Sequence, residues 1–287
     1  MLDVIIALLP ALIVSIMMFG SRAAVLAGLC VASCVFFEWA FEKILTKKNT
    51  INDLTAVITG LLVAFCLPVT IPFWQAVFGS FVAIIVVKQL FGGLGKNFAN
   101  PAVTARVVML VAFPTTMMAT GSIIAVDAIT GATPLLDIVN GDIEVLEGLW
   151  YLFLGVHGAC LGDTSWLALL IGGLYLLIRR VITVHAPLAF IATVFLLTAL
   201  FDADPVQQVF SGGLFLGAIF MATDYVTTPL TKSGRLIFGI GAGLFTVIIR
   251  LYGSYPEGVP FAILLMNMIV PYINKLTARK ALGGVKV

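Results

Sequence analysis

Long apolar runs recur along almost the whole chain, and each is close to the length needed to cross a bilayer. A membrane-spanning helix needs about 20 predominantly apolar residues. The runs cover residues 2–20, 22–45, 53–70, 73–91, 99–115, 164–180, 185–202, 206–223, 234–253 and 258–276. Only 10% of the 287 residues are charged, whereas soluble domains carry about a quarter. The pattern therefore predicts an all-α, multi-pass membrane protein with about ten transmembrane helices.

The distribution of basic residues predicts how these spans are oriented. Residues 148–160 form a further apolar stretch that is too short to cross, so we expect a re-entrant or interfacial helix there. If it does not cross, all the basic clusters between spans fall on one side. They comprise Lys43, Lys47, Lys48, Lys88, Lys96, Arg179, Arg180, Lys232, Arg235, Lys275, Arg279, Lys280 and Lys286. Because basic loops favour the cytoplasm, both termini are predicted to be cytoplasmic.

The same parity gives the two halves of the chain opposite orientations. We expect a single polytopic membrane domain, with a first half (1–115), an external loop (116–147) and a second half (148–287). Each half carries five spans, an inverted arrangement known from transporters, in which the functional site lies between the repeats. The first run begins at Leu2 without a basic segment before it, so it is interpreted as a retained span. No basic stripe indicates nucleic-acid binding.

The predicted external loop contains the stretch Asp127-Ala128-Ile129-Thr130-Gly131-Ala132-Thr133-Pro134. Pro134 biases Thr133 toward an extended backbone, and the small residues before it leave its hydroxyl sterically open. From residue chemistry alone, an ordinary surface turn is the favoured explanation of the stretch, because threonine, glycine and proline are common turn residues.

The stretch resembles the Asp-x-x-Ser/Thr-Gly-Ala-Thr motif of the RnfD/NqrB family of membrane flavoproteins. In that family a flavin transferase joins FMN to the last threonine through a phosphoester. The resemblance implies covalent FMN on Thr133, with Asp127, Thr130, Gly131 and Ala132 recognised by the transferase. It extends over nearly the whole chain, and the first span begins almost at residue 1, which favours the RnfD branch.

A glycine-rich segment, residues 91–102, interrupts two apolar runs on the predicted cytoplasmic side. Pro101 suits the first turn of a helix and Asn100 suits its N-cap, so a capped glycine loop is one explanation. The segment is also similar to the family's Gly-Gly-x-Gly-x-Asn-x-x-Asn-Pro-Ala signature. In relatives of this type the two asparagines contact a non-covalent riboflavin, which implies that role for Asn97 and Asn100.

Charged residues near or inside the apolar runs are the remaining candidates. Asp224 closes one run in a stretch similar to the family's Met-Ala-Thr-Asp element, and it is either paired with Arg235 or part of an ion path. Arg106 lies one to two turns inside its run and should face protein or cofactor, where a flavin carbonyl is the candidate partner. Most of the other charges can reach an interface with their long side chains; they are Glu38, Asp53, Lys88 and Arg250.

Cysteine spacing gives no indication of a metal centre. Cys30, Cys34, Cys66 and Cys160 all fall in apolar segments and show no Cys-x-x-Cys spacing. Cys30 and Cys34 share a helix face, but no second pair accompanies them. Buried free cysteine usually packs as a small hydrophobe, so we expect structural cysteines and no metal on this chain.

The resemblance implies a membrane subunit of an Rnf-type complex in the bacterial inner membrane. Such a complex passes electrons between ferredoxin and NAD while moving Na⁺ or H⁺, and this chain would hold cofactors that carry the redox chemistry. About 30 Å of hydrocarbon would separate its two flavins, so a relay through a partner subunit is expected. The alternative is a secondary transporter or channel subunit without redox chemistry, because inverted halves suit that function equally well.

Overall fold

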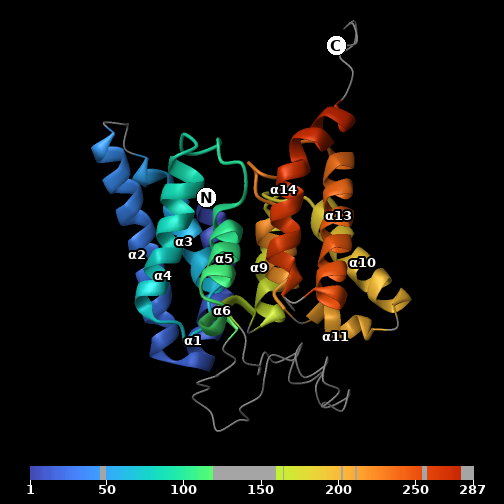
Figure 1. Ribbon diagram of the computed structural model, residues 1–287, viewed down its shortest axis with the longest axis horizontal. Helices are drawn as coiled ribbons and strands as arrows, with labels where there is room; N and C mark the ends of the chain where they lie inside the picture. Colours follow the sequence, from blue (N-terminus) through green and yellow to red (C-terminus); the bar gives the residue numbers. More distant parts are fainter. Residues whose placement is uncertain are drawn as a thin grey trace, which may run out of the picture.

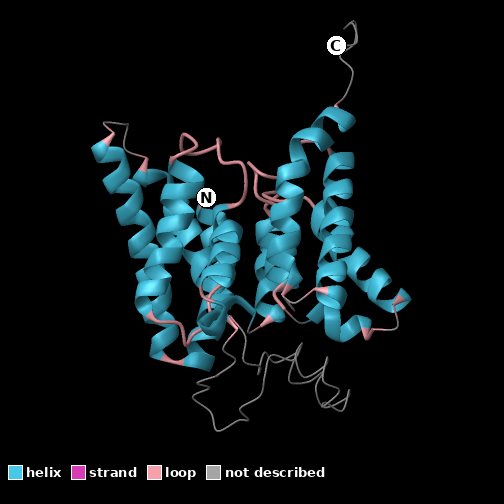
Figure 2. Ribbon diagram, in the orientation of Figure 1, coloured by secondary structure: helices cyan, strands magenta, loops and turns pink. Residues whose placement is uncertain are grey.

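The computed structural model describes residues 1–45, 50–118, 160–163, 165–201, 203–210, 212–253 and 257–278. Over these residues the chain is helical and has no β-strand, as the uniformly cyan ribbons of Figure 2 show. Helices lie at the positions of all the predicted spans, which supports an all-α membrane protein. The external loop and the short helix expected at 148–160 lie outside the described residues, apart from their ends.

The two halves of the chain are built from successive helices. The first half contains α1 (Leu2–Phe19), α2 (Ser21–Ile44), η1 (Ile51–Asp53), α3 (Thr55–Phe65), α4 (Phe73–Phe81), η2 (Val82–Gln89), α5 (Pro101–Ala112) and α6 (Pro114–Met117). The second half contains η3 (Leu161–Asp163), α9 (Trp166–Ile178), α10 (His185–Leu200), α11 (Pro205–Phe210), α12 (Leu214–Leu216), η4 (Gly217–Met221), α13 (Lys232–Tyr252) and α14 (Gly258–Thr277).

Helix length separates these elements into two groups. Among the described residues, α1, α2, α13 and α14 are long and apolar enough to cross a membrane by length and composition. Other apolar helices are shorter, such as α3 with 11 residues and α5 with 12. The structure therefore supports a multi-pass membrane protein, while ten complete crossings stay a prediction.

Two of the predicted spans are interrupted, which corrects the expectation of continuous helices over 53–70 and 206–223. The first stops at Phe65, and Pro68 and Pro72 follow, each without the backbone N–H that would continue a helix. The second stops at Phe210 and resumes at Leu214. Gly212 and Gly213 lie between the two pieces with φ of 67°, a conformation that glycine adopts without steric cost.

Arginine side chains donate to carbonyls in these interruptions and in the helix turn beside them. Arg22 donates to the carbonyls of Val69 at 2.8 Å and Thr70 at 3.1 Å. In the second half, Arg250 donates to the carbonyls of Gln208 and Gly212. Irregular backbone at membrane depth is tolerated only where protein or water satisfies it. These contacts allow both breaks to be buried.

The halves stand side by side, with α1–α5 on one side of Figure 1 and α9–α14 on the other. Between them, α1 packs against α9 and α5 packs against α14. The α1–α9 crossing is very close, because a Cβ atom at Gly172 would lie 2.0 Å from the carbonyl oxygen of Ala7. One extended hydrophobic core includes residues of both halves, such as Leu26 and Phe238.

Candidate functional site

The start of α5 confirms the predicted helix cap. The Asn100 side-chain oxygen accepts hydrogen bonds from the backbone N–H groups of Ala102 at 3.0 Å and Val103 at 3.3 Å. Pro101 occupies the first turn, where its missing N–H costs nothing. Asn100 is buried, so this cap fixes the end of α5 inside the protein and not at its surface.

Further bonds tie this helix start to the second half of the chain. The Asn100 side-chain N–H₂ donates to the carbonyl of Met221 at 3.4 Å. The Asn267 amide, oriented so that both its groups are satisfied, accepts from the Asn100 backbone N–H and donates to the carbonyl of Thr227, both at 3.1 Å. The α5 start, the residues after η4 and the middle of α14 thus form one connected unit.

Asp224 lies in the turn that follows η4, where its carboxylate is used within the turn. It accepts from the Thr227 hydroxyl at 3.0 Å and from the backbone N–H groups of Tyr225 and Val226. Burial raises the pKa of Asp224, and these hydrogen bonds partly oppose that shift. The predicted ion pair with Arg235 is wrong. Arg235 instead donates to the carbonyl of Pro229 and to the Thr183 hydroxyl, because the turn already occupies the carboxylate.

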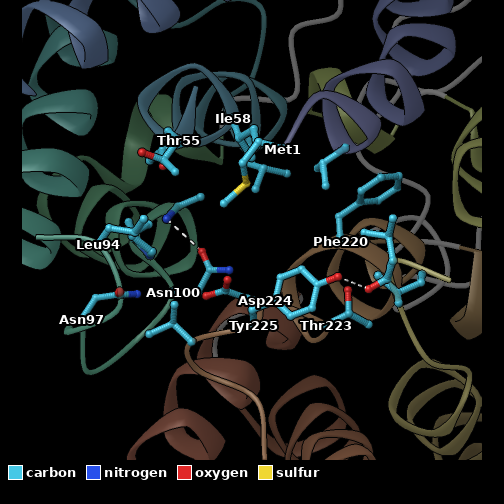
Figure 3. A pocket seen from close by; sticks show the side chains of 18 of the residues that line it. Met1, Thr55, Ile58, Leu94, Asn97, Asn100, Phe220, Thr223, Asp224 and Tyr225 are labelled. Carbon is cyan, nitrogen blue, oxygen red and sulfur yellow. Dashed lines mark hydrogen bonds between the residues drawn. The ribbon is translucent and has the colours of Figure 1, made fainter. Parts of the chain in front are cut away.

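A cavity of about 260 Å³ opens between the two halves at this point. Figure 3 shows Leu94, Asn97 and Asn100 on one side of it and Phe220 and Thr223 on another. Its walls are mainly apolar, with a few polar groups between them, as in most small-molecule sites. The cavity brings together three predicted site residues, Asn97, Asn100 and Asp224, from segments more than 100 positions apart.

The chain segments around the cavity agree with the predicted parity of the spans. Met1, the segment containing Asn97, Val181 and Tyr225 all line it. These residues precede span 1, follow span 4, follow span 6 and follow span 8. An alternating up-and-down path puts all four at one end of the molecule, which the charge distribution predicts to be the cytoplasmic end.

Asn97 and Asn100 differ in which side-chain atoms remain available to bind a ligand. Asn100 uses its oxygen for the cap and its N–H₂ for Met221. Asn97 is half-buried, and its N–H₂ donates to the carbonyl of Ala99 at 3.0 Å. Among the described residues its amide oxygen has no hydrogen-bond partner. Asn97 therefore offers an acceptor to the cavity, whereas Asn100 mainly shapes the wall.

Arg106 does not belong to this cavity. Its guanidinium is buried, forms an ion pair with Glu257 at the start of α14, and donates to the carbonyl of Cys66 after α3. Because α5 and α3 both start at the cavity and both run away from it, this pair lies toward the opposite end of the molecule. Of the two expected surroundings, protein or cofactor, the structure thus gives Arg106 protein groups, away from Asn97 and Asn100.

Lys88 is a cavity residue that the sequence interpretation missed. We expected Lys88 and Glu38 to extend toward an interface, but they are 3% and 1% exposed and form a buried ion pair. Lys88 lines the cavity together with Thr55. The available signal was the opposite charge of two residues on the second and fourth predicted spans, each inside an apolar run.

The predicted attachment site lies outside the described residues. This applies to Thr133 and to the other members of its motif, Asp127, Thr130, Gly131 and Ala132. The described chain that follows this segment is anchored, because the Leu161 N–H donates to the carbonyl of Leu67 at 3.1 Å.

Comparison with known proteins gives the family. The sequence model of the NQR2, RnfD, RnfE family matches residues 1–283. This chain belongs to that family. Among relatives, the D-type subunit of a Na(+)-translocating ferredoxin:NAD(+) oxidoreductase complex from Acetobacterium woodii is 46% identical, over 100% of this chain and 91% of the relative. The corresponding subunit of a proton-translocating ferredoxin:NAD(+) oxidoreductase complex from Clostridium ljungdahlii is 41% identical, over 96% of this chain and 89% of the relative.

A third relative is the D-type subunit of an ion-translocating oxidoreductase complex from Stutzerimonas stutzeri. It is 40% identical, over 99% of this chain and 91% of the relative. The match to the NQR2, RnfD, RnfE family covers both halves of the fold and all the residues that line the cavity. The resemblance inferred from the short motifs is thereby confirmed at the level of the family.

Proposed function

We propose that this chain is the D-type membrane subunit of an ion-translocating ferredoxin:NAD⁺ oxidoreductase complex. The observation that carries the proposal is similarity along the full chain to subunits with that name. On this proposal the chain lies in a bacterial inner membrane beside other subunits of the complex, and Na⁺ or H⁺ moves outward. It has no complete activity alone, because its role is to hold and tune cofactors.

We propose riboflavin as the occupant of the cavity at Asn97 and Asn100. The walls fit a flat, mostly apolar ring. The volume of the cavity, about 260 Å³, lies just below the range of roughly 300–1,000 Å³ that is usual for small-molecule sites. The Asn97 amide oxygen would accept from the N–H of the ring, and Asn100 would hold the wall in place. When bound, the flavin supplies a group that accepts and passes on electrons.

We propose that Thr133 carries FMN as a phosphoester on the outer side, attached by a flavin transferase that recognises Asp127, Thr130, Gly131 and Ala132. The support is the motif together with the position of the chain on either side of it. Met118 follows the short helix α6 at the end of α5, and Leu161 is tied to the residues after α3. Both α3 and α5 start at the cavity. At about 1.5 Å per residue, α3 and α5 extend roughly 16–18 Å, so two flavins would lie toward opposite ends.

We also propose that residues 1–115 and 148–287 are inverted halves of one membrane domain. The support is that the first helices of the two halves contact each other, as do the last helices. The third span is interrupted in both. Interrupted spans are also typical of secondary transporters, so a permease without redox chemistry is the competing function.

The redox function and the permease function are distinguished by measuring whether flavin stays attached to the denatured protein. The full chain, produced with its transferase, would be denatured and its flavin divided into released and retained fractions. We expect yellow colour to stay with the protein and an FMN-mass adduct on the peptide that spans Gly131–Asp137. Thr133→Val should abolish the adduct, whereas Thr115→Val, outside the motif, should keep it. An unmodified peptide in fully assembled, active complex would favour the permease.

A second measurement addresses the cavity. Riboflavin should appear in the released fraction of the wild-type chain and fall severalfold in Asn97→Ala. Lys96→Ala changes an exposed neighbour in the same segment that does not line the cavity, and it should release as much riboflavin as the wild type. Equal release from all three proteins would place the flavin elsewhere.

A further inference from the structure

The buried ion pair beside the cavity joins α2 to η2. The Lys88 ammonium donates to both carboxylate oxygens of Glu38, at 2.7 and 2.9 Å, and to the Thr55 hydroxyl at 2.7 Å. Gln89 donates to the same carboxylate at 3.2 Å. Breaking such a pair from one side leaves a buried charge without compensation. Removing either Lys88 or Glu38 alone is therefore expected to be more destabilising than removing both charges together.

The local helix geometry brings Lys88 to this position. Residues Val82–Gln89 form a π-helix, a rare conformation that is found frequently at functional sites. Val87, Lys88 and Gln89 are buried in succession. The wider turn lets both Lys88 and Gln89 reach Glu38 while Lys88 also borders the cavity. An ion pair that only linked α2 to η2 would not require Lys88 to border the cavity.

The ion pair is oriented with its positive end toward the cavity. Lys88 and Thr55 both line the cavity, whereas Glu38 does not. Thr55 accepts from Lys88, and a hydroxyl that accepts one bond still has its own hydrogen to donate. The cavity wall therefore presents a polarised hydroxyl backed by an ammonium group. In a protein interior such a charge acts more strongly than in water.

We propose that Lys88 and Thr55 form a tuning site that favours the reduced state of the flavin in this cavity, with Glu38 as a positioning residue that holds Lys88. The inference rests on the proposed riboflavin site. An oxidised flavin that takes two electrons from a redox partner in the complex and one proton from water becomes a monoanion. The Lys88 charge and the Thr55 donor stabilise that added negative charge and do nothing comparable for the neutral oxidised ring.

The test is a redox titration of the non-covalent flavin in the full chain purified in detergent, with Thr133→Val as the background so that no covalent flavin contributes. The decisive variant is Lys88→Met combined with Glu38→Gln, because it removes both charges together. We expect the preference for the reduced flavin to fall about tenfold, which is about 30 mV for a two-electron couple. Lys88→Arg should keep the wild-type potential within a third of that shift.

Two further variants sharpen the result. Thr55→Val leaves the ion pair intact and should shift the potential in the same direction by a smaller amount. Lys96→Met removes an exposed lysine that does not line the cavity, and it should leave the potential unchanged. If the double variant fails to assemble, Thr55→Val decides, since a merely structural pair would give it the wild-type potential.

The outcomes separate this inference from the proposal on which it rests. Bound flavin with an unchanged potential in the double variant and in Thr55→Val would overturn the tuning role and leave the riboflavin site standing. An equal shift in Lys96→Met would also overturn it, because any lysine would then suffice. A wild-type chain that binds no riboflavin would remove the site itself.

Discussion

The close crossing of α1 and α9 gives the sharpest prediction about stability. A Cβ atom at Gly172 would lie 2.0 Å from the carbonyl oxygen of Ala7, whereas such atoms need more than 3 Å. The two helices must therefore part by more than 1 Å in Gly172→Ala. Gly79 provides the matched control, because it is also buried within a helix and its added Cβ would meet the Met109 side chain at an ordinary 3.5 Å.

The two substitutions are expected to change the free energy of unfolding in opposite directions. Replacing a helix-interior glycine by alanine gains about 0.5–1 kcal/mol, and this gain is all that Gly79→Ala should show. Overpacking a tight contact costs about 1–3 kcal/mol, so Gly172→Ala should lose roughly 1–2 kcal/mol net. A difference of this size corresponds to a fall of several °C in the midpoint of thermal unfolding.

The assay can use the cysteines of the chain itself. Cys30, Cys34, Cys66 and Cys160 are buried thiols that form no disulfide, so a thiol-reactive fluorophore reports unfolding as each becomes accessible. The midpoint for Gly172→Ala should lie below that of the wild type, and the midpoint for Gly79→Ala should lie at or above it. A Gly172→Ala protein as stable as Gly79→Ala would refute the close packing of the two halves.

Three further predictions concern single contacts. Asn100→Ala should lower the unfolding free energy by about 1 kcal/mol through loss of the cap, while Asn100→Ser, which keeps an accepting oxygen without a buried charge, should lose less in the same thermal assay. Arg106→Met should cost about 3–5 kcal/mol because Glu257 is left without its cation, and adding Glu257→Gln should restore part of the lost midpoint. Burial raises the pKa of Asp224 above its ordinary value, so the folded chain holds the carboxyl proton more tightly than the unfolded chain. The folded chain therefore loses stability as pH rises from the ordinary pKa through the raised pKa of the folded state. Asp224→Asn should therefore gain more thermal stability over the wild type at pH 7 than at pH 4, and equal gains at both would contradict the shift.

Local interactions were readable from the sequence. The positions of the apolar helices were predictable because burying apolar residues in a bilayer depends on the run itself. The Asn100 cap was also predictable, because its oxygen bonds backbone groups only two and three residues away. The order of the spans and their basic ends also predicted that the segments now found around the cavity lie at one end of the molecule. For Thr133, the motif is the support, and its FMN remains a proposal.

The tertiary structure decided where polar groups at membrane depth find partners. A hydropathy pattern treats Lys88 and Glu38 alike whether they reach an interface or each other, yet they pair across 50 positions of chain. It likewise left open whether Arg106 faces protein or cofactor, and the structure pairs it with Glu257, 151 positions away. It also treated the breaks after Phe65 and Phe210 as continuous spans, because the arginines that donate to the carbonyls beyond them come from other helices. Such pairings depend on distances in the folded state, and no local average of the sequence contains them.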